Sequence, residues 1–103
     1  MIDAASLPDF EGFDWDEGNV EKKWLSHQVT PQEAEQVFFN IPLLLLKDVK
    51  HSNREPRFHA LGKTDDKRLL HITFTLRHGE EKIRVISARG MHRKERAIYE
   101  KAT

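Results

Sequence analysis

Cationic, imidazole and hydroxyl side chains that could bind a phosphate are concentrated in the second half of the sequence. In the segment from Leu69 to Tyr99, apolar and polar residues alternate along two expected strands, which directs one set of these side chains to a single face of the sheet. A surface of this kind favours polyanions and could hold a scissile phosphate. The alternative is an ordinary polar sheet face, where lysine and arginine discourage edge-to-edge aggregation. With neighbours from the preceding strand and the following helix, the set comprises Arg57, His59, His71, Thr73, Thr75, Arg77, Lys82, Arg84, Arg89, Arg93, Lys94 and Arg96.

Metal and cofactor chemistry receives little support from the sequence. The six histidines are scattered, and no pair has the spacing and carboxylate partner typical of a metal site. Cysteine is absent, which excludes disulfides and thiolate metal sites. The sequence contains neither a glycine-rich phosphate loop nor a serine nucleophile elbow. We therefore expect a protein that uses no cofactor.

The formal net charge of the 103-residue chain is zero because two oppositely charged halves cancel. Residues 1–42 contain nine acidic residues and two lysines, whereas residues 43–103 contain fifteen basic and eight acidic residues. Either the basic half is a phosphate-binding surface, or the two halves neutralise each other across the fold. The sequence has no apolar run of membrane length and no signal-peptide pattern. We expect a cytoplasmic protein with a single domain over residues 1–103, of which 1–12 are a loosely ordered lead-in.

Two helices are expected before the long strands. Asp16 can cap a first helix that runs to about His27. The sequence TPQE at Thr30–Glu33 is a capping box with proline at the first helical position, so a second helix begins there. This helix ends at Asn40–Pro42. Ahead of both helices, residues 10–15 form either a short strand or a hydrophobic lead-in.

From Leu43 onward the hydrophobic period changes to that of strands. A turn at His78 and Gly79 would join the two longest strands and place Phe74 opposite Ile83, which makes their apolar face continuous. The result is an α+β fold with an antiparallel four-stranded sheet, helices on its apolar face and the other face open. The expected elements are strands over residues 43–49, 54–63, 69–77 and 80–89, followed by a basic helix over residues 91–101.

Several short segments, taken in order, resemble the BrnT family of bacterial type II toxins. The clearest are ISAR at Ile86–Arg89 and KERAIY at Lys94–Tyr99. Each motif is weak by itself, but the ordered set spans about residues 13–100. The chain departs from the family at Asn19, where many members have lysine, and at Lys23, where they have asparagine. Agreement extends to FDWD at residues 13–16 and to His27, Val29, Glu33, Ala34, Val37, Phe38, His51, Ser52, Glu55, Arg57 and Gly62.

The resemblance implies a RelE-like fold, with two N-terminal helices, the antiparallel sheet and a C-terminal helix, and a ribonuclease toxin that arrests translation by cleaving RNA. Such enzymes need no metal, because the RNA's own 2′-hydroxyl attacks the adjacent phosphate. We predict that Arg57 and Arg89 bind this phosphate, since a guanidinium binds phosphate oxygens bidentately. Glu55 or His51 is expected as the base or as a group that orients the arginines. Tyr99 is expected to stack on a base, donate a proton or anchor the last helix. The residues expected to contact RNA are His71, Arg77, Lys82, Arg84, Arg93, Lys94 and Arg96.

The partner that the resemblance implies is an antitoxin with a ribbon-helix-helix DNA-binding domain, encoded by the adjacent gene. The complex of toxin and antitoxin would repress its own operon, and the toxin would contact operator DNA only through the antitoxin. No membrane partner is expected. The competing interpretation is a catalytically inactive module whose basic face only binds the antitoxin or acts in co-repression.

Overall fold

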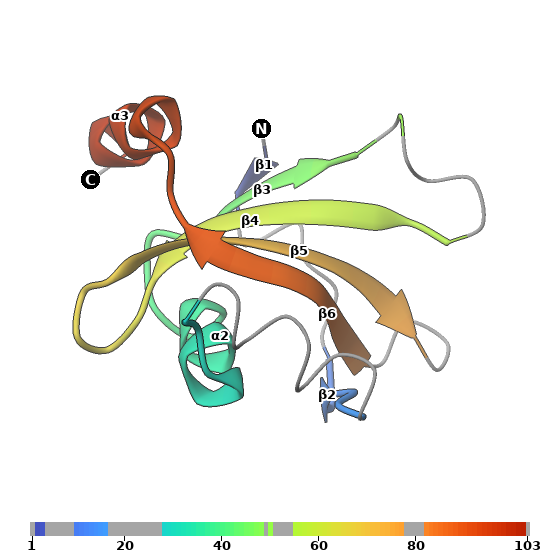
Figure 1. The fold of residues 1–103 in the computed structure, drawn as a ribbon. Helices are drawn as coiled ribbons and strands as arrows, with labels where there is room; N and C mark the ends of the chain where they lie inside the picture. The colour runs from blue at the N-terminus through green and yellow to red at the C-terminus, as the bar shows by residue number, and fades with distance from the viewer. Residues whose placement is uncertain are drawn as a thin grey trace.

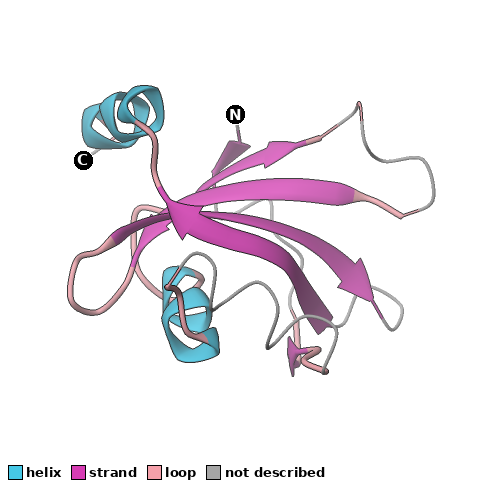
Figure 2. Cartoon of the chain, viewed as in Figure 1, coloured by secondary structure: helices cyan, strands magenta, loops and turns pink. Residues whose placement is uncertain are grey.

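The computed structural model describes residues 2–3, 10–16, 28–48, 50, 55–77 and 82–102. Within them, one curved sheet separates two helices (Figures 1 and 2). None of the described helices is long and apolar enough to cross a membrane. The elements are β1 (Ile2–Asp3), β2 (Gly12–Phe13), α2 (Pro31–Val37), β3 (Leu44–Lys47), β4 (Arg57–Lys63), β5 (Leu69–Arg77), β6 (Lys82–Gly90) and α3 (Arg93–Lys101).

The six described strands form one mixed sheet in the order β1-β3-β4-β5-β6-β2. The four longer strands are antiparallel neighbours, but β2 runs parallel to β6 and β1 adds to β3 at the opposite edge. The predicted RelE-like arrangement with a four-stranded antiparallel sheet is therefore wrong. Each additional strand is two residues long, which is too short for hydrophobic alternation to reveal. β2 occupies the position where a short strand was expected near residues 10–15.

Of the predicted pair of N-terminal helices, α2 is the one within the described residues. The first predicted helix, from Asp16 to about His27, falls on residues 17–27, which lie outside them. The capping box of α2 is confirmed: Thr30 Oγ1 accepts a hydrogen bond from the Glu33 amide at 3.1 Å, and Glu33 Oε1 accepts one from the Thr30 amide at 3.0 Å. These reciprocal bonds satisfy two amides at the start of the helix and fix where it begins.

α2 covers one face of the sheet and closes the main hydrophobic core. Gly62 of β4 lies directly beneath it, and a Cβ atom at this position would be only 2.6 Å from Val37 Cγ1. The close approach of helix and sheet at this point therefore requires glycine. The buried members of the core are Val29, Ala34, Val37, Phe38, Leu43, Leu45, Ala60, Leu70, Ile72, Phe74, Leu76, Ile83, Val85 and Ala88.

The pairing of β5 with β6 differs by two residues from the predicted register. Phe74 pairs with Val85, and Leu76 pairs with Ile83, because four residues rather than two separate the ends of these strands. The predicted turn at His78 and Gly79 lies outside the described residues. A shift of two residues keeps the side chains of β6 as far as Val85 on their predicted faces, since side chains alternate with a period of two. Beyond Val85 the predicted faces are reversed, because Ala88 rather than Ser87 enters the core. An irregularity in the ladder between Thr73 and Phe74 adds one residue to β6, as in a β-bulge.

α3 lies on the opposite face of the sheet from α2 (Figure 1). The prediction that the helices share the apolar face is therefore wrong for α3. Tyr99 packs with Leu61 and Met91 in a second, smaller core, and its hydroxyl donates a hydrogen bond to the Pro42 carbonyl at 2.6 Å. The apolar residue Leu61 of β4, on the otherwise polar face, gives this helix a place to dock.

Candidate functional site

The sheet face opposite α2 carries a regular grid of polar side chains, which we call the polar face. It consists of the alternate residues of β4, β5 and β6 whose neighbours on the same strand point into the main core. Because paired residues of adjacent strands share a face, three rows cross the sheet. The rows are Leu61–His71–Arg89, His59–Thr73–Ser87 and Arg57–Thr75–Arg84.

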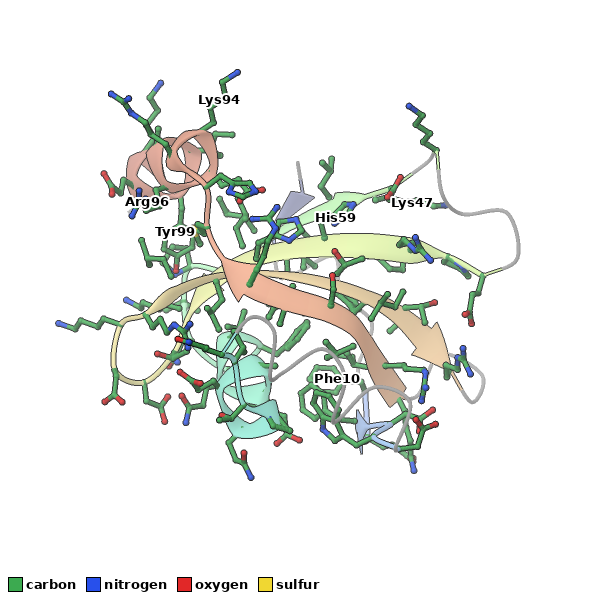
Figure 3. The ribbon with its side chains drawn as sticks, in the orientation of Figure 1. Phe10, Lys47, His59, Lys94, Arg96 and Tyr99 are labelled. Atoms are coloured by element: carbon green, nitrogen blue, oxygen red, sulfur yellow. The ribbon has the colours of Figure 1, made fainter. Side chains whose placement is uncertain are left out.

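Two histidines from neighbouring strands are in ring contact on this face. The ring centroids of His59 and His71 are 4.9 Å apart, with an angle of 36° between the rings. His59 Nε2 lies 2.9 Å from Asp48 Oδ2, and its Nδ1 lies 3.0 Å from Thr73 Oγ1. The carboxylate of Asp48 therefore favours a proton on Nε2 and orients the ring, as carboxylate partners of histidine do in general. Figure 3 shows His59 on the side of the sheet where α3 lies.

His71 joins the histidine pair to a partly buried ion pair at the start of α3. Arg89 donates two hydrogen bonds to Glu95, at 2.8 and 3.0 Å, and Glu95 also accepts one from the His92 amide at 2.8 Å. His71 Nε2 lies 3.8 Å from Glu95 Oε2. The buried Nδ1 of His71 has no hydrogen-bond partner among the described atoms.

These surroundings fix the charge of both groups near neutral pH. Burial, assisted by the charge of Arg89, lowers the pKa of His71 from 6.5 to about 4, so this imidazole is neutral at pH 7. Burial raises the pKa of Glu95, but hydrogen bonds from Arg89 and the His92 amide outweigh it and bring the pKa down to about 2. The site therefore presents an anion and a neutral imidazole side by side.

A pocket of about 320 Å³ opens between the sheet and α3 beside these groups. Its residues come from β3, β4, β5 and α3, so it exists only where the helix crosses the polar face. Three of its residues are apolar and three are titratable. They are Leu46, Leu61 and Ile98, and His59, His71 and Glu95.

Several arginines of the polar face are neutralised by carboxylates of the same chain. Arg84 forms a bidentate pair with Asp16, at 2.9 and 3.0 Å, and lies 3.6 Å from Asp14. Arg77 pairs with Glu55 at 2.9 Å. The open basic surface that the sequence suggested is thus partly neutralised, because carboxylates come from the N-terminal segment, from Glu55 just before β4 and from Glu95 of α3. The contacts of Arg84 match the alternative in which the two charged halves neutralise each other.

The residues predicted to be catalytic do not meet at one point. Arg89 and its partner Glu95 lie at the α3 end of the polar face, Arg57 lies on β4, and Glu55 lies beside Arg77. Tyr99 is buried, burial raises its pKa, and its hydroxyl is bonded to the Pro42 carbonyl. His51 lies outside the described residues. The catalytic roles of these residues stay predictions.

The residues predicted to contact RNA also divide into groups. His71 lines the pocket, whereas Arg77 and Arg84 are held in ion pairs. Lys82 begins β6, opposite Arg77. Figure 3 shows Lys94 and Arg96 on α3, and Arg93, Lys94 and Arg96 are all exposed.

Sequence reasoning did not bring out His59, Asp48 and Glu95 as one site. His59 and Asp48 are eleven residues apart on neighbouring strands, and Glu95 comes from a helix. Strand alternation had placed His59 and His71 on one face, which is the only signal of their proximity. Among the described residues, no group of three histidine, aspartate or glutamate side chains is placed to hold a metal.

Comparison with known proteins gives this site its context. The family model of the ribonuclease toxin BrnT, of type II toxin–antitoxin systems, matches residues 15–95. This stretch contains His59, His71, Arg89 and Glu95. A comparison with curated proteins finds no match. Because the match spans most of the 103 residues, it confirms the resemblance of the short motifs, and the chain belongs to the BrnT family of ribonuclease toxins.

Proposed function

We propose that this toxin cleaves RNA without a metal ion, that cleavage arrests translation in the cytoplasm, and that RNA binds on the polar face of the sheet. The family supports ribonuclease activity as such. The observation that carries the rest is the ring contact of His59 and His71, which lie between Asp48 and the ion pair of Arg89 and Glu95. This arrangement brings groups that can move a proton next to groups that can bind a phosphate.

The proposed reaction uses the RNA's own 2′-hydroxyl as the nucleophile. Its oxygen attacks the adjacent phosphorus, the bond from phosphorus to the 5′-oxygen breaks, and the products carry a 2′,3′-cyclic phosphate and a 5′-hydroxyl. One proton must leave the 2′-hydroxyl and one must reach the 5′-oxygen, and the extra negative charge on the phosphate must be stabilised. Side chains alone can supply these functions.

His59 is the residue that we assign to proton transfer. Its side chain is 27% exposed, against 12% for His71, so it is the more accessible imidazole. Asp48 favours the proton on Nε2 and leaves Nδ1, which now faces the Thr73 hydroxyl, as the nitrogen that can accept a proton. A neutral His71 packs against this ring without repelling its positive form.

Arg57 and Arg89 retain the role of phosphate binders in this proposal. Arg57 lies two residues before His59 on β4, hence on the same face and about 7 Å away along the strand. Arg89 is held rigidly by Glu95, which fixes the plane of its guanidinium. A fixed guanidinium loses little side-chain entropy when it binds a phosphate.

The test is RNA cleavage by purified protein in buffer containing EDTA. The variant His59→Gln keeps a polar side chain but cannot carry the proton, and we expect cleavage to fall by about 100-fold or more. Asp48→Asn should reduce cleavage less, and Asp66→Asn, at an exposed position in the turn after β4, is its matched control. Folding of each variant is checked by circular dichroism and thermal melting.

Two results would contradict distinct parts of this proposal. Wild-type cleavage that requires added Mg²⁺ would refute metal independence. Wild-type rates in a folded His59→Gln variant would refute the assignment of His59. Arrest of protein synthesis on expression, measured by incorporation of labelled amino acids, tests the cellular consequence separately.

As a type II toxin, the chain acts with an antitoxin. We propose that this partner is a ribbon-helix-helix protein from the adjacent gene and that the complex represses its own operon. Co-expression of the neighbouring reading frame should relieve growth arrest. A neighbour without a ribbon-helix-helix sequence that still relieves arrest would contradict the assigned type of antitoxin.

The second candidate is a module that binds the antitoxin but has lost catalysis. The observation in its favour is that Arg77, Arg84 and Arg89 are already paired with carboxylates of their own chain. The family departures at Asn19 and Lys23 lie outside the described residues. Intact RNA after incubation with the wild-type protein, together with normal antitoxin binding, would favour this module.

A further inference from the structure

We infer that the pocket between α3 and the sheet binds one nucleobase of the RNA, and that it prefers bases carrying an amino group over uracil. This inference rests on the proposed RNA cleavage, because it assigns part of the substrate to the same site. The pocket would determine which base lies beside the scissile phosphate, and hence where the toxin cuts.

The size and walls of the pocket suit a flat, mostly apolar ring. Its volume of about 320 Å³ is at the small end of ligand sites, which range over about 300–1,000 Å³, so it admits a base but no helix of a partner protein. Leu46, Leu61 and Ile98 supply apolar walls. The tilted imidazoles of His59 and His71 add planar rings, on which bases of any sequence can stack.

Glu95 lines the pocket beside His59 and His71, and it is the residue among them that carries a negative charge. Its Oε1 accepts hydrogen bonds from Arg89 and from the His92 amide, which uses both acceptor positions. Its Oε2 accepts only one bond, from Arg89, among the described residues, and this oxygen is the one nearest His71 Nε2. One acceptor position therefore stays open beside an imidazole nitrogen.

An acceptor at this position selects for an amino group. Adenine, cytosine and guanine each carry an exocyclic amine that can donate to a carboxylate, as cytosine does to glutamate in nucleic-acid complexes. Uracil has carbonyl oxygens in the corresponding places, and these would repel the Glu95 anion. An acidic side chain of a protein partner would be repelled for the same reason.

The surroundings of the pocket suit the RNA backbone attached to such a base. α3 forms one wall through Ile98 and carries the exposed cations Arg93, Lys94 and Arg96 in the same turns (Figure 3). Exposed cations on the helix that forms this wall favour binding of the RNA backbone in general. The pocket thus combines planar rings and one specific acceptor, on a helix that also carries cations.

Binding of single nucleotides tests the pocket independently of cleavage. AMP, CMP, GMP and UMP are titrated into the wild-type protein while the imidazole NMR signals of His59 and His71 are followed. We expect at least one amino-bearing nucleotide to bind about tenfold more tightly than UMP. Ile98→Trp, which fills the pocket from an exposed position, should weaken this binding by about tenfold or more. Ile41→Trp is the matched control, because Ile41 is 80% exposed and lies outside the pocket.

Mapping of the cleaved sites connects the pocket to the reaction. Wild-type protein should cut beside a restricted set of bases that excludes uracil, and Ile98→Trp should broaden this set. An unchanged set in Ile98→Trp, or equal binding of UMP and the other nucleotides, would overturn the inference. If Ile98→Trp lost only antitoxin binding, the pocket would be a protein site and the inference would again be wrong.

The outcomes separate this inference from the proposed function. Wild-type protein that binds AMP, CMP or GMP selectively at His59 and His71 but leaves RNA intact would refute the catalytic proposal and support the base site. Protein that cleaves RNA at every base alike would support the catalytic proposal and refute the base site.

Discussion

Replacement of Gly62 by alanine should destabilise the fold by forcing α2 away from the sheet. The added Cβ would lie 2.6 Å from Val37 Cγ1, 3.2 Å from the Val37 carbonyl oxygen and 3.4 Å from Leu43 Cδ1. Val37 is completely buried at the C-terminal end of α2, so relief of this contact requires a shift of its side chain within the packed core or of the end of the helix. The contact must therefore be relieved by displacement of a packed element.

The magnitude follows from two opposing effects. An additional methyl group in a packed core costs about 1–3 kcal/mol. Alanine in place of glycine also restricts the unfolded chain and returns about 0.4–1 kcal/mol. The net loss for Gly62→Ala should be about 1–2 kcal/mol, and the melting temperature should fall by about 4–8 °C for each kcal/mol.

Gly90→Ala is the matched control for this measurement. Gly90 ends β6, and a Cβ there would meet nothing within 4 Å. We expect its unfolding free energy in urea to equal or slightly exceed that of the wild type. If Gly62→Ala unfolds at the same urea concentration as Gly90→Ala, the helix is not held against the sheet as closely as argued, and the reasoning fails.

Three further substitutions test the capping box, the anchor of α3 and the buried imidazole. Thr30→Ala removes the bond that the Thr30 hydroxyl accepts from the Glu33 amide and the one that it donates to Glu33 Oε1. This change should lower the unfolding free energy in urea by about 1 kcal/mol, and an unchanged value would contradict the role of the cap. Tyr99→Phe leaves the Pro42 carbonyl without its donor and should destabilise the fold by about 1 kcal/mol. Loss of RNA cleavage in this variant without any loss of stability would instead indicate a catalytic tyrosine. The pKa of His71 is about 4 in the folded protein and 6.5 in the unfolded chain. The contribution of His71 to the unfolding free energy is therefore complete above pH 6.5 and declines as the pH falls toward 4. This decline should reach about 3 kcal/mol at pH 4 and should be absent in a folded His71→Gln variant. If both proteins lost stability equally in acid, the lowered pKa of His71 would be refuted.

The parts of the fold that sequence could predict are those governed by local chemistry. The capping box at Thr30 marked the start of α2, and alternation identified the strands of the hairpin, β5 and β6, and their two faces. β1 could not be predicted, because a strand of two residues has no measurable period. A short strand at the position of β2 was one of two expectations, but its parallel pairing with β6 could not be predicted, because the two strands are far apart in the sequence. The register of β5 with β6 depended on a turn length that local propensity did not determine.

From the sequence, only the polar face of the sheet that holds the candidate site could be predicted, and not the contacts within it. Alternation directed His59 and His71 to one face, but their ring contact depends on which strands are neighbours and in what register. The pairing of Arg84 with Asp16 joins residues 68 positions apart, so no local pattern shows that this cation is neutralised. The position of α3 was missed because its short apolar stripe does not indicate which face of the sheet it contacts.

The separate docking of α3 gives the chain two levels of stability. Its small core of Leu61, Met91 and Tyr99 is distinct from the main core under α2. Detachment of the helix therefore leaves the main core closed and requires less free energy than global unfolding. Amide protons of α3 should then exchange with solvent through a partial opening that those of β5 do not share.

This partial opening also removes the binding pocket, because Ile98 and Glu95 belong to the helix that detaches. The open form keeps a folded sheet but has no wall on which to hold a base. The fraction of molecules able to bind a ligand there is set by the docking equilibrium of one helix of nine residues. A protein that captures this helix in its undocked form would switch the site off without contacting the pocket residues of the sheet.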